Sequence, residues 1–123
     1  KWKNMNDDAV ENLEVWPEAG ERAARVYELL RECRDFEFRG QFLAAAVSVS
    51  NNMAEGCERS SNAEFIRFLD IARGSGGDAR SQTHVALRVK LLKEADAHAL
   101  MADSKRLSKR IARLMEVRRK DFT

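Results

Sequence analysis

The stretch NNMAEGCERSSNAEFIRFLDIARGS, residues 51–75, contains the end of one predicted helix and the start of the next. Ser61 and Glu64 have the spacing of a capping box. In that motif the hydroxyl accepts from the N–H three residues on, and the carboxylate accepts from the N–H of the cap residue. Gly56 lies where a helix commonly ends on a left-handed residue. The stretch therefore predicts a corner between two antiparallel helices, with Glu55, Gly56, Ser61 and Glu64 as its structural residues.

Helical periodicity continues from this corner through a run of glycines. The apolar positions keep one helical phase, at ~100° per residue, on both sides of Gly74–Gly77. A flexible linker or an anion-binding turn is the alternative interpretation, but a loop would not be expected to preserve the phase. We expect one helix over residues 61–92. Because each glycine costs roughly 1 kcal/mol in an exposed helix, close packing at Gly76 is expected too.

Three further segments have the period of amphipathic helices. They span about residues 17–34, with Pro17 in the first turn, and about residues 38–56 and 95–119. Four helices with short connections predict an all-α fold, an antiparallel up-down-up-down four-helix bundle. One Pro and six Gly in 123 residues are consistent with a mainly helical chain.

Length and composition indicate a single domain over residues 1–123, with residues 1–14 expected to form a flexible tail. Hydrophobic residues make up 44% of the chain and charged residues 34%, which is too apolar for a disordered protein. No window approaches the ~18 to 20 apolar residues of a membrane span, and residues 1–16 lack the apolar stretch of a signal peptide. We therefore expect a cytoplasmic protein with no membrane partner.

The segment SVSNNMAEGCERSSNAEFIRFLDIARGS, residues 48–75, resembles a group of bacterial four-helix bundle proteins. The group includes proteins encoded in intervening sequences of 23S ribosomal RNA genes and the accessory variability determinant of diversity-generating retroelements. The similarity covers about residues 16–114. Its most specific parts are NMAEG, EFIRFL and IARGS.

The resemblance implies an up-down bundle that assembles as a barrel-like homopentamer and has no established enzymatic activity. The retroelement members look like basic nucleic-acid-binding partners of a reverse transcriptase. Such proteins typically have an apolar residue after the Gly-Ser pair. This chain keeps Asp78 but has Gly76 at the apolar position, which affects the expected straightness of the third helix.

Glu55 is the residue in the corner that most resembles a catalytic carboxylate. A structural role is the favoured alternative, because Arg59 or Arg67 could pair with it. Glycosidase or aspartic-protease chemistry would also need a second carboxylate placed against it, and none is evident. We expect no catalytic residues and a protein that is not an enzyme.

The histidines and cysteines also lack the spacing of known sites. His84 and His98 are not preceded by the Glu of the Glu-x-x-His pairs in bundle di-iron proteins. Cys33 and Cys57 are too far apart for a CxxC redox or zinc motif. We expect no metal and no cofactor.

The last predicted helix has the most one-sided charge in the chain, with eight basic residues and one acidic residue between Lys105 and Lys120. Aligned cations neutralise phosphates and release counterions, which is typical of RNA or DNA binding. A solvated polar face is the alternative, and the absence of aromatic residues from this stripe argues against reading a single strand of defined sequence. The candidate nucleic-acid-binding residues are Lys105, Arg106, Lys109, Arg110 and Arg113.

A second apolar stripe on the third helix, away from the core, contains Ile71, Val85, Val89 and Leu92. We take these as an oligomer interface, although scattered surface apolar residues are common. The expected partners are further copies of the chain, RNA or DNA, and a nucleic-acid enzyme such as a reverse transcriptase. The alternative function is a protein–protein interaction scaffold that binds no nucleic acid.

Overall fold

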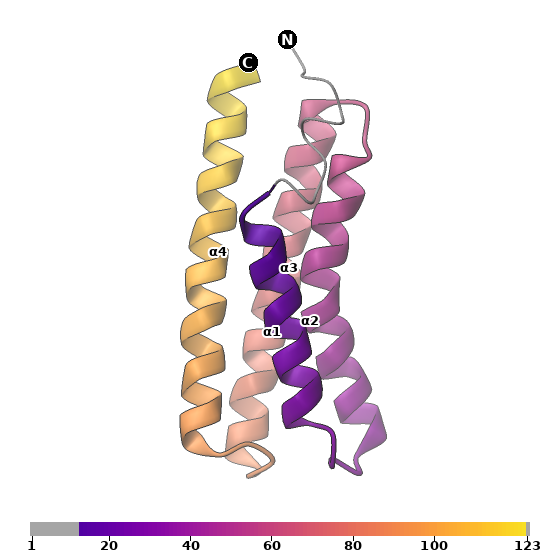
Figure 1. Cartoon of the computed structure of the whole chain (residues 1–123), viewed down its shortest axis with the longest axis vertical. Coiled ribbons are helices and arrows are strands. Elements are labelled where there is room, and N and C mark those ends of the chain that lie inside the picture. The colour runs from indigo at the N-terminus through magenta and orange to yellow at the C-terminus, as the bar shows by residue number, and fades with distance from the viewer. Residues whose placement is uncertain (1–12, 123) are drawn as a thin grey trace.

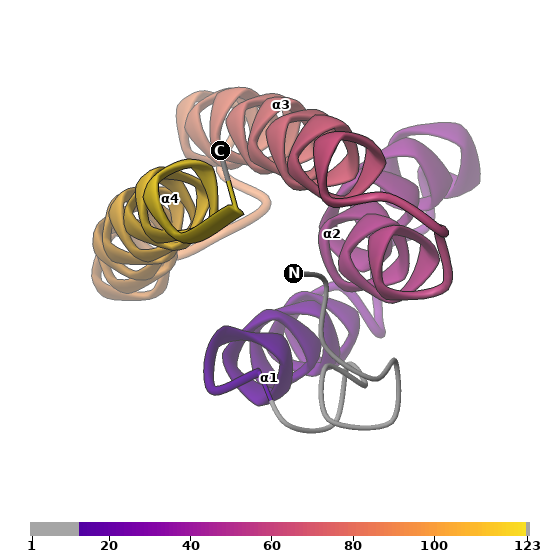
Figure 2. The ribbon, with the colours of Figure 1, turned by 90° about the horizontal axis from the view of Figure 1, so that it is seen from above.

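The computed structural model describes residues 13–122 of the chain. Over this range the helices run alternately up and down, helices that follow one another in the chain lie side by side, and the last closes on the first (Figure 1, Figure 2). Their bounds are α1, Val15–Leu29; α2, Phe36–Cys57; α3, Asn62–Arg88; and α4, Glu94–Phe122. The predicted all-α, up-down-up-down four-helix bundle is confirmed.

The ends of α1 and α2 differ from the prediction by a few residues. α1 starts earlier and stops at Leu29 instead of near residue 34. α2 begins at Phe36, because the Asp35 carboxylate accepts a hydrogen bond from the N–H of Phe38 at 3.1 Å and caps the helix. The predicted tail over residues 1–14 falls mostly outside the described residues, but Leu13 already lies against the core.

The third helix runs unbroken through Gly74–Gly77, as the preserved phase predicted. Its end is different: α3 stops at Arg88, and Lys90 turns the chain with a φ of 65°. Leu92 therefore lies beyond the helix, is 6% exposed and packs in the core. The expectation that Leu92 belongs to an exposed stripe on this helix is wrong, because the turn rotates it inward.

The cap at the start of α3 forms only one half of the predicted capping box. The Ser61 hydroxyl accepts a hydrogen bond from the N–H of Glu64 at 3.2 Å. The Glu64 carboxylate accepts from the guanidinium of Arg67, at 3.2 and 3.4 Å, instead of reaching back to the cap residue. One hydroxyl is enough to start the helix here.

Gly56 has a different role from the one predicted. No described glycine has a positive φ, and α2 continues through Gly56 to Cys57. A Cβ at residue 56 would lie 2.9 Å from the Cβ of Phe68 and 3.3 Å from the carbonyl oxygen of Phe65. Glycine is therefore present because α2 and α3 approach each other too closely for a side chain.

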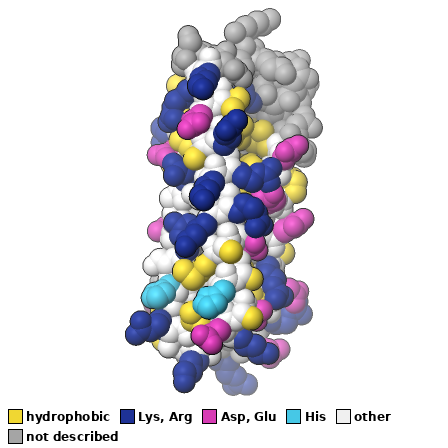
Figure 3. Space-filling model, turned by 90° about the vertical axis from the view of Figure 1, so that its left-hand side faces the viewer, with side chains coloured by type: hydrophobic (Ala, Val, Ile, Leu, Met, Phe, Trp, Pro, Cys, Tyr) yellow, Lys and Arg dark blue, Asp and Glu magenta, His cyan; other side chains and the backbone are white. Residues whose placement is uncertain are grey.

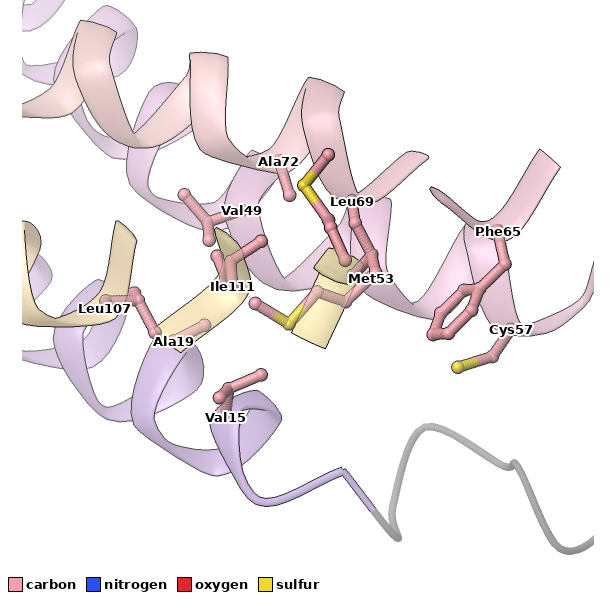
Figure 4. Packing of buried hydrophobic residues seen from close by; sticks show 11 residues of the cluster. Val15, Ala19, Val49, Met53, Cys57, Phe65, Leu69, Ala72, Leu107 and Ile111 are labelled. Atoms are coloured by element: carbon pink, nitrogen blue, oxygen red, sulfur yellow. The ribbon is translucent and has the colours of Figure 1, made fainter. Parts of the chain in front are cut away.

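The interior is divided into two apolar clusters with buried polar side chains between them. One cluster includes Val49 of α2 and Ile111 of α4, whose side chains point into the bundle (Figure 4). The other is formed by the opposite halves of the same helices. Ser104 is buried between Leu100 of one cluster and Leu107 of the other. Thr83 is buried within the half of α3 that belongs to the second cluster, where it donates to the carbonyl of Ala79 at 2.8 Å.

Candidate nucleic-acid interface

Helix α4 buries one stripe and leaves a basic side exposed. Leu107, Ile111 and Met115 are at most 5% exposed, and Leu114 packs partly against the same cluster. Because these residues recur at three- and four-residue steps, the cations between them point away from the core. Figure 3 shows Lys and Arg side chains along the length of this face.

Lys105, Lys109 and Arg113 form what we term the α4 ridge. All three are exposed and follow one another at four-residue steps, about 6 Å apart along the helix axis. None of them forms an ion pair with any residue between 13 and 120. Three of the five candidate residues therefore present uncompensated positive charge to solvent.

Arg106 and Arg110 have a different environment. Arg106 pairs with Asp103 one turn earlier in α4, at 2.9 Å. Arg110 reaches across to α1, where its guanidinium pairs with Glu18 and with Glu14, the latter at 3.4 Å. These two cations are partly neutralised, and Arg110 also links α4 to α1.

Two cations of α3, Arg73 and Arg80, were not among the residues predicted from the sequence. Arg80 donates to the hydroxyl of Ser104 at 3.4 Å, which places its guanidinium at the boundary between α3 and α4. Arg73 lies seven residues earlier and so on the same side of the helix, where it is paired only loosely with Asp70, at 3.9 Å. From the sequence, the seven-residue spacing could have shown that Arg73 and Arg80 share one side of α3. The contact of Arg80 with Ser104 is what shows that this side adjoins α4.

A buried arginine was also missed. Arg22 of α1 is 6% exposed and donates to the carbonyl of Leu100 at 3.2 Å, while its Nε has no partner among the described residues. Burial lowers the pKa of Arg22 to about 10, with Asp103 raising it and Arg80 lowering it further. The guanidinium thus remains charged at neutral pH between α1 and α4.

The corner residues have structural partners. Glu55 pairs with Arg59 at 3.2 Å, and both side chains are close to half exposed. Arg67, the other partner that the sequence suggested, binds Glu64 instead. Glu55 is therefore an exposed, ion-paired side chain at the end of α2.

The two histidines lie on the same face of the bundle, where Figure 3 shows both rings in view. His84 and His98 are exposed. Between residues 13 and 120, no three His, Cys, Asp or Glu side chains gather closely enough to hold a metal ion. Cys33 is half-buried and Cys57 is buried.

The second stripe of α3 is partly as expected. Ile71, Val85 and Val89 are 38%, 42% and 59% exposed. Asp78 is exposed and lies seven residues from both Ile71 and Val85, hence on the same side of the helix. The exposed apolar residues are thus separated by a carboxylate.

Comparison with known proteins places this bundle in a family. The family model described as 23S rRNA-intervening sequence protein matches residues 11–113. The chain belongs to this family. The resemblance seen in residues 48–75 is thereby confirmed.

One solved structure is similar to this member of the 23S rRNA-intervening sequence protein family. It is a crystal structure of a protein of unknown function from the S23 ribosomal protein family of Bacteroides thetaiotaomicron VPI-5482. The two chains are 23% identical, with a TM-score of 0.76 over 82% of this chain and 97% of the other, which supports the shared fold. No curated protein matches the chain. In the described part, no helix is long and apolar enough to cross a bilayer.

Proposed function

We propose that this member of the 23S rRNA-intervening sequence protein family is a non-enzymatic, self-assembling bundle that binds RNA or DNA phosphates along the α4 ridge. The observation that carries the proposal is the ridge itself, with Lys105, Lys109 and Arg113 exposed and without acidic partners among the described residues. Arg73 and Arg80 add positive charge on the α3 side. The non-enzymatic part of the proposal is supported by Glu55, the one carboxylate that resembled a catalytic residue, because it is ion-paired with Arg59.

Uncompensated cations matter because they determine counterion release. When the logarithm of the binding constant is plotted against the logarithm of the salt concentration, each neutralised phosphate contributes about −0.9 to the slope for duplex DNA and about −0.7 for a single strand. Three free cations thus support a slope of about −2 to −3. No exposed aromatic residue lies on this ridge, so we propose contacts to the backbone and not to the bases.

RNA is the partner to test first, because the family description refers to 23S rRNA. The compartment that goes with this partner is the cytoplasm, which agrees with the expectation from the sequence. A filter-binding titration with duplex RNA, single-stranded RNA and duplex DNA at about 50 and 200 mM salt measures both affinity and slope. Absence of binding at the lower salt concentration for all three would contradict the proposal.

Charge reversal identifies the surface. We expect Lys105→Glu, Lys109→Glu and Arg113→Glu together to abolish binding at about 200 mM salt. The matched control reverses Arg34, Arg88 and Lys93, which are exposed at or beside the turns that join α1 to α2 and α3 to α4. Equal loss in both triple variants would mean that net charge, and not the ridge, governs binding.

Self-assembly rests on a separate observation, the exposure of Ile71, Val85 and Val89 on α3. We propose a homopentamer, as the family resemblance implies. Light scattering would then give a mass of about 70 kDa, five times the 14.0 kDa of the chain. A mass of one chain at micromolar concentration would contradict the proposal, whereas Val85→Asp is expected to lower the mass of an assembly.

The second candidate function is a scaffold for another protein, including a nucleic-acid enzyme such as a reverse transcriptase. The exposed cations of the α4 ridge favour a partner with an acidic surface. The same triple charge reversal separates the two functions. The scaffold would be supported if the unaltered chain binds a protein partner but no nucleic acid, and if the triple variant loses that protein partner.

A further inference from the structure

A hollow of about 480 Å³ lies between the start of α1 and the second half of α4. Its origin is the unequal length of the two helices. α1 begins at Val15, while α4 continues past its contact with α1 at Arg110 as far as Phe122. Leu114 and Val117, in the turns after Arg110, therefore have less of α1 beside them, and they form one wall of the hollow.

The floor and the rim of this hollow differ in chemistry. Leu13 and Val15 of the α1 side face the apolar wall formed by α4. Lys109 and Arg113 stand at the rim with no ion pair to a described residue, whereas the neighbouring Arg110 is occupied by Glu14 and Glu18. An apolar cavity of a few hundred Å³ with a few convergent polar groups is the usual form of a small-molecule site.

We propose that this hollow binds a long-chain carboxylate, with the alkyl chain between α1 and α4 and the carboxylate held by Lys109 and Arg113. The charge complementarity decides the class of ligand. Five of the nine lining residues are charged, but Glu14, Arg106 and Arg110 are already in ion pairs, so Lys109 and Arg113 are the lining cations that remain to bind an anion. A neutral hydrocarbon would leave both cations without a partner. A small inorganic anion would leave the apolar walls uncovered.

The geometry also limits the length of the ligand. Lining residues of α4 extend from Arg106 to Val117, which is about 16 Å along the helix axis. This length suits an alkyl chain of about a dozen carbons, and each buried methylene is expected to strengthen binding about fourfold. Because the site and the α4 ridge share Lys109 and Arg113, the bound carboxylate would compete with a nucleic acid. The binding itself does not depend on the proposed function.

Calorimetric titration of the full chain with dodecanoate, decanoate and octanoate, all below the concentrations at which they form micelles, tests the site. We expect affinity to fall about fourfold for each methylene removed. Dodecanol, the uncharged match, is expected to bind at least about tenfold more weakly, because it cannot pair with the two cations. No binding of dodecanoate up to about 1 mM would overturn the proposal, as would equal binding of dodecanol.

Two substituted proteins test whether dodecanoate binds in this hollow. Val117→Asp places a carboxylate on the apolar wall at a side chain that is 40% exposed, and we expect at least about a tenfold loss of dodecanoate binding. Its control is Leu91→Asp, which places the same carboxylate at a side chain that is 38% exposed in the turn between α3 and α4, away from the hollow. Lys109→Ser with Arg113→Ser removes the cations, and its control is Arg34→Ser with Lys93→Ser.

The cation variant keeps the test decisive if Val117→Asp alters folding, because both of its side chains are exposed. Circular dichroism establishes which variants retain the helical fold. Unchanged dodecanoate affinity in the folded cation variant would overturn the proposal. So would association of dodecanoate with the protein only in the presence of lipid vesicles, since that would indicate a membrane surface as the true binding partner.

Discussion

The α2–α3 seam and the α1–α4 seam are held together in different ways. Between α2 and α3 the contacts are close and small, with Gly56 against two phenylalanines and the hydroxyls of Ser48 and Ser75 2.9 Å apart. Between α1 and α4 the contacts are long and charged, with Arg25 paired to Asp96 at 3.2 Å and Arg22 buried beside α4. The α2–α3 seam depends on close packing, whereas long charged side chains supplement the apolar contacts that α1 and α4 share.

This difference determines what each seam tolerates. A close-packed seam has no room for added atoms, so small increases in volume strain it. A seam of partly solvated ion pairs adds little stability and leaves hollows, but its side chains can rearrange. We therefore expect α2 and α3 to form the rigid half of the bundle and α1 to be its least firmly held helix.

The largest effect is expected at Gly56. Gly56→Ala would place a Cβ 2.9 Å from the Cβ of Phe68, and we expect a loss of about 1–3 kcal/mol in the free energy of unfolding. Gly74→Ala is the control, because nothing lies within 4 Å of a Cβ there. That variant is expected to gain up to about 1 kcal/mol from helix propensity. Equal stability of the two variants in urea would mean that the α2–α3 seam is not close-packed.

Hydrogen exchange provides the next test. Amides in the middle of α1 are expected to exchange about tenfold faster than those of α2 and α3 at the same level of the bundle, because α1 makes fewer contacts with the other helices than α2 or α3 does. Mass spectrometry of peptides from the exchanged protein measures the difference. Uniform protection across all helices would remove the distinction between the seams.

A smaller effect is expected for Arg22→Met. The substitution removes a desolvated charge along with one hydrogen bond to the carbonyl of Leu100. Replacing a buried charged group with an apolar one of similar volume is often neutral or stabilising, so we expect a change within about 1 kcal/mol in urea unfolding. A loss above about 2 kcal/mol would show that this hydrogen bond is a main support of the α1–α4 seam.

The smallest effect is expected for Glu55→Gln. The pair that Glu55 makes with Arg59 is nearly half exposed on both sides, and such pairs contribute little. We expect a change in unfolding free energy below about 0.5 kcal/mol. A loss of more than about 1 kcal/mol would restore the idea that Glu55 locks the corner of α2 and α3.

Much of the fold could be predicted because it depends on local sequence. The phase of the apolar residues located α3 across Gly74–Gly77, and the hydroxyl of Ser61 marked its start. Gly56 was misinterpreted because a glycine near a helix end has two explanations, a left-handed turn or a close neighbour. Only the position of α3 distinguishes them.

The candidate site was predictable only in part. Periodicity placed five cations on one side of α4, but it carries no information on which acidic residues of α1 lie across the seam. For the same reason the burial of Arg22 and Leu92 was not foreseen. The burial of Arg22 depends on the packing of α1 against α4, and the burial of Leu92 depends on the left-handed turn at Lys90.

The division of the α4 cations has a consequence for mutational scanning. Lys105 and Arg106 are neighbours in sequence, as are Lys109 and Arg110, yet in each pair the first is unpaired among the described residues and the second is ion-paired. A scan that scored only cellular activity would not distinguish loss of an unpaired surface cation from loss of a cation that an acidic neighbour already compensates. Scoring nucleic-acid binding directly would separate them: we expect substitutions at Lys105 and Lys109 to weaken binding more than those at Arg106 and Arg110, so the size of the effect would alternate from one residue to the next.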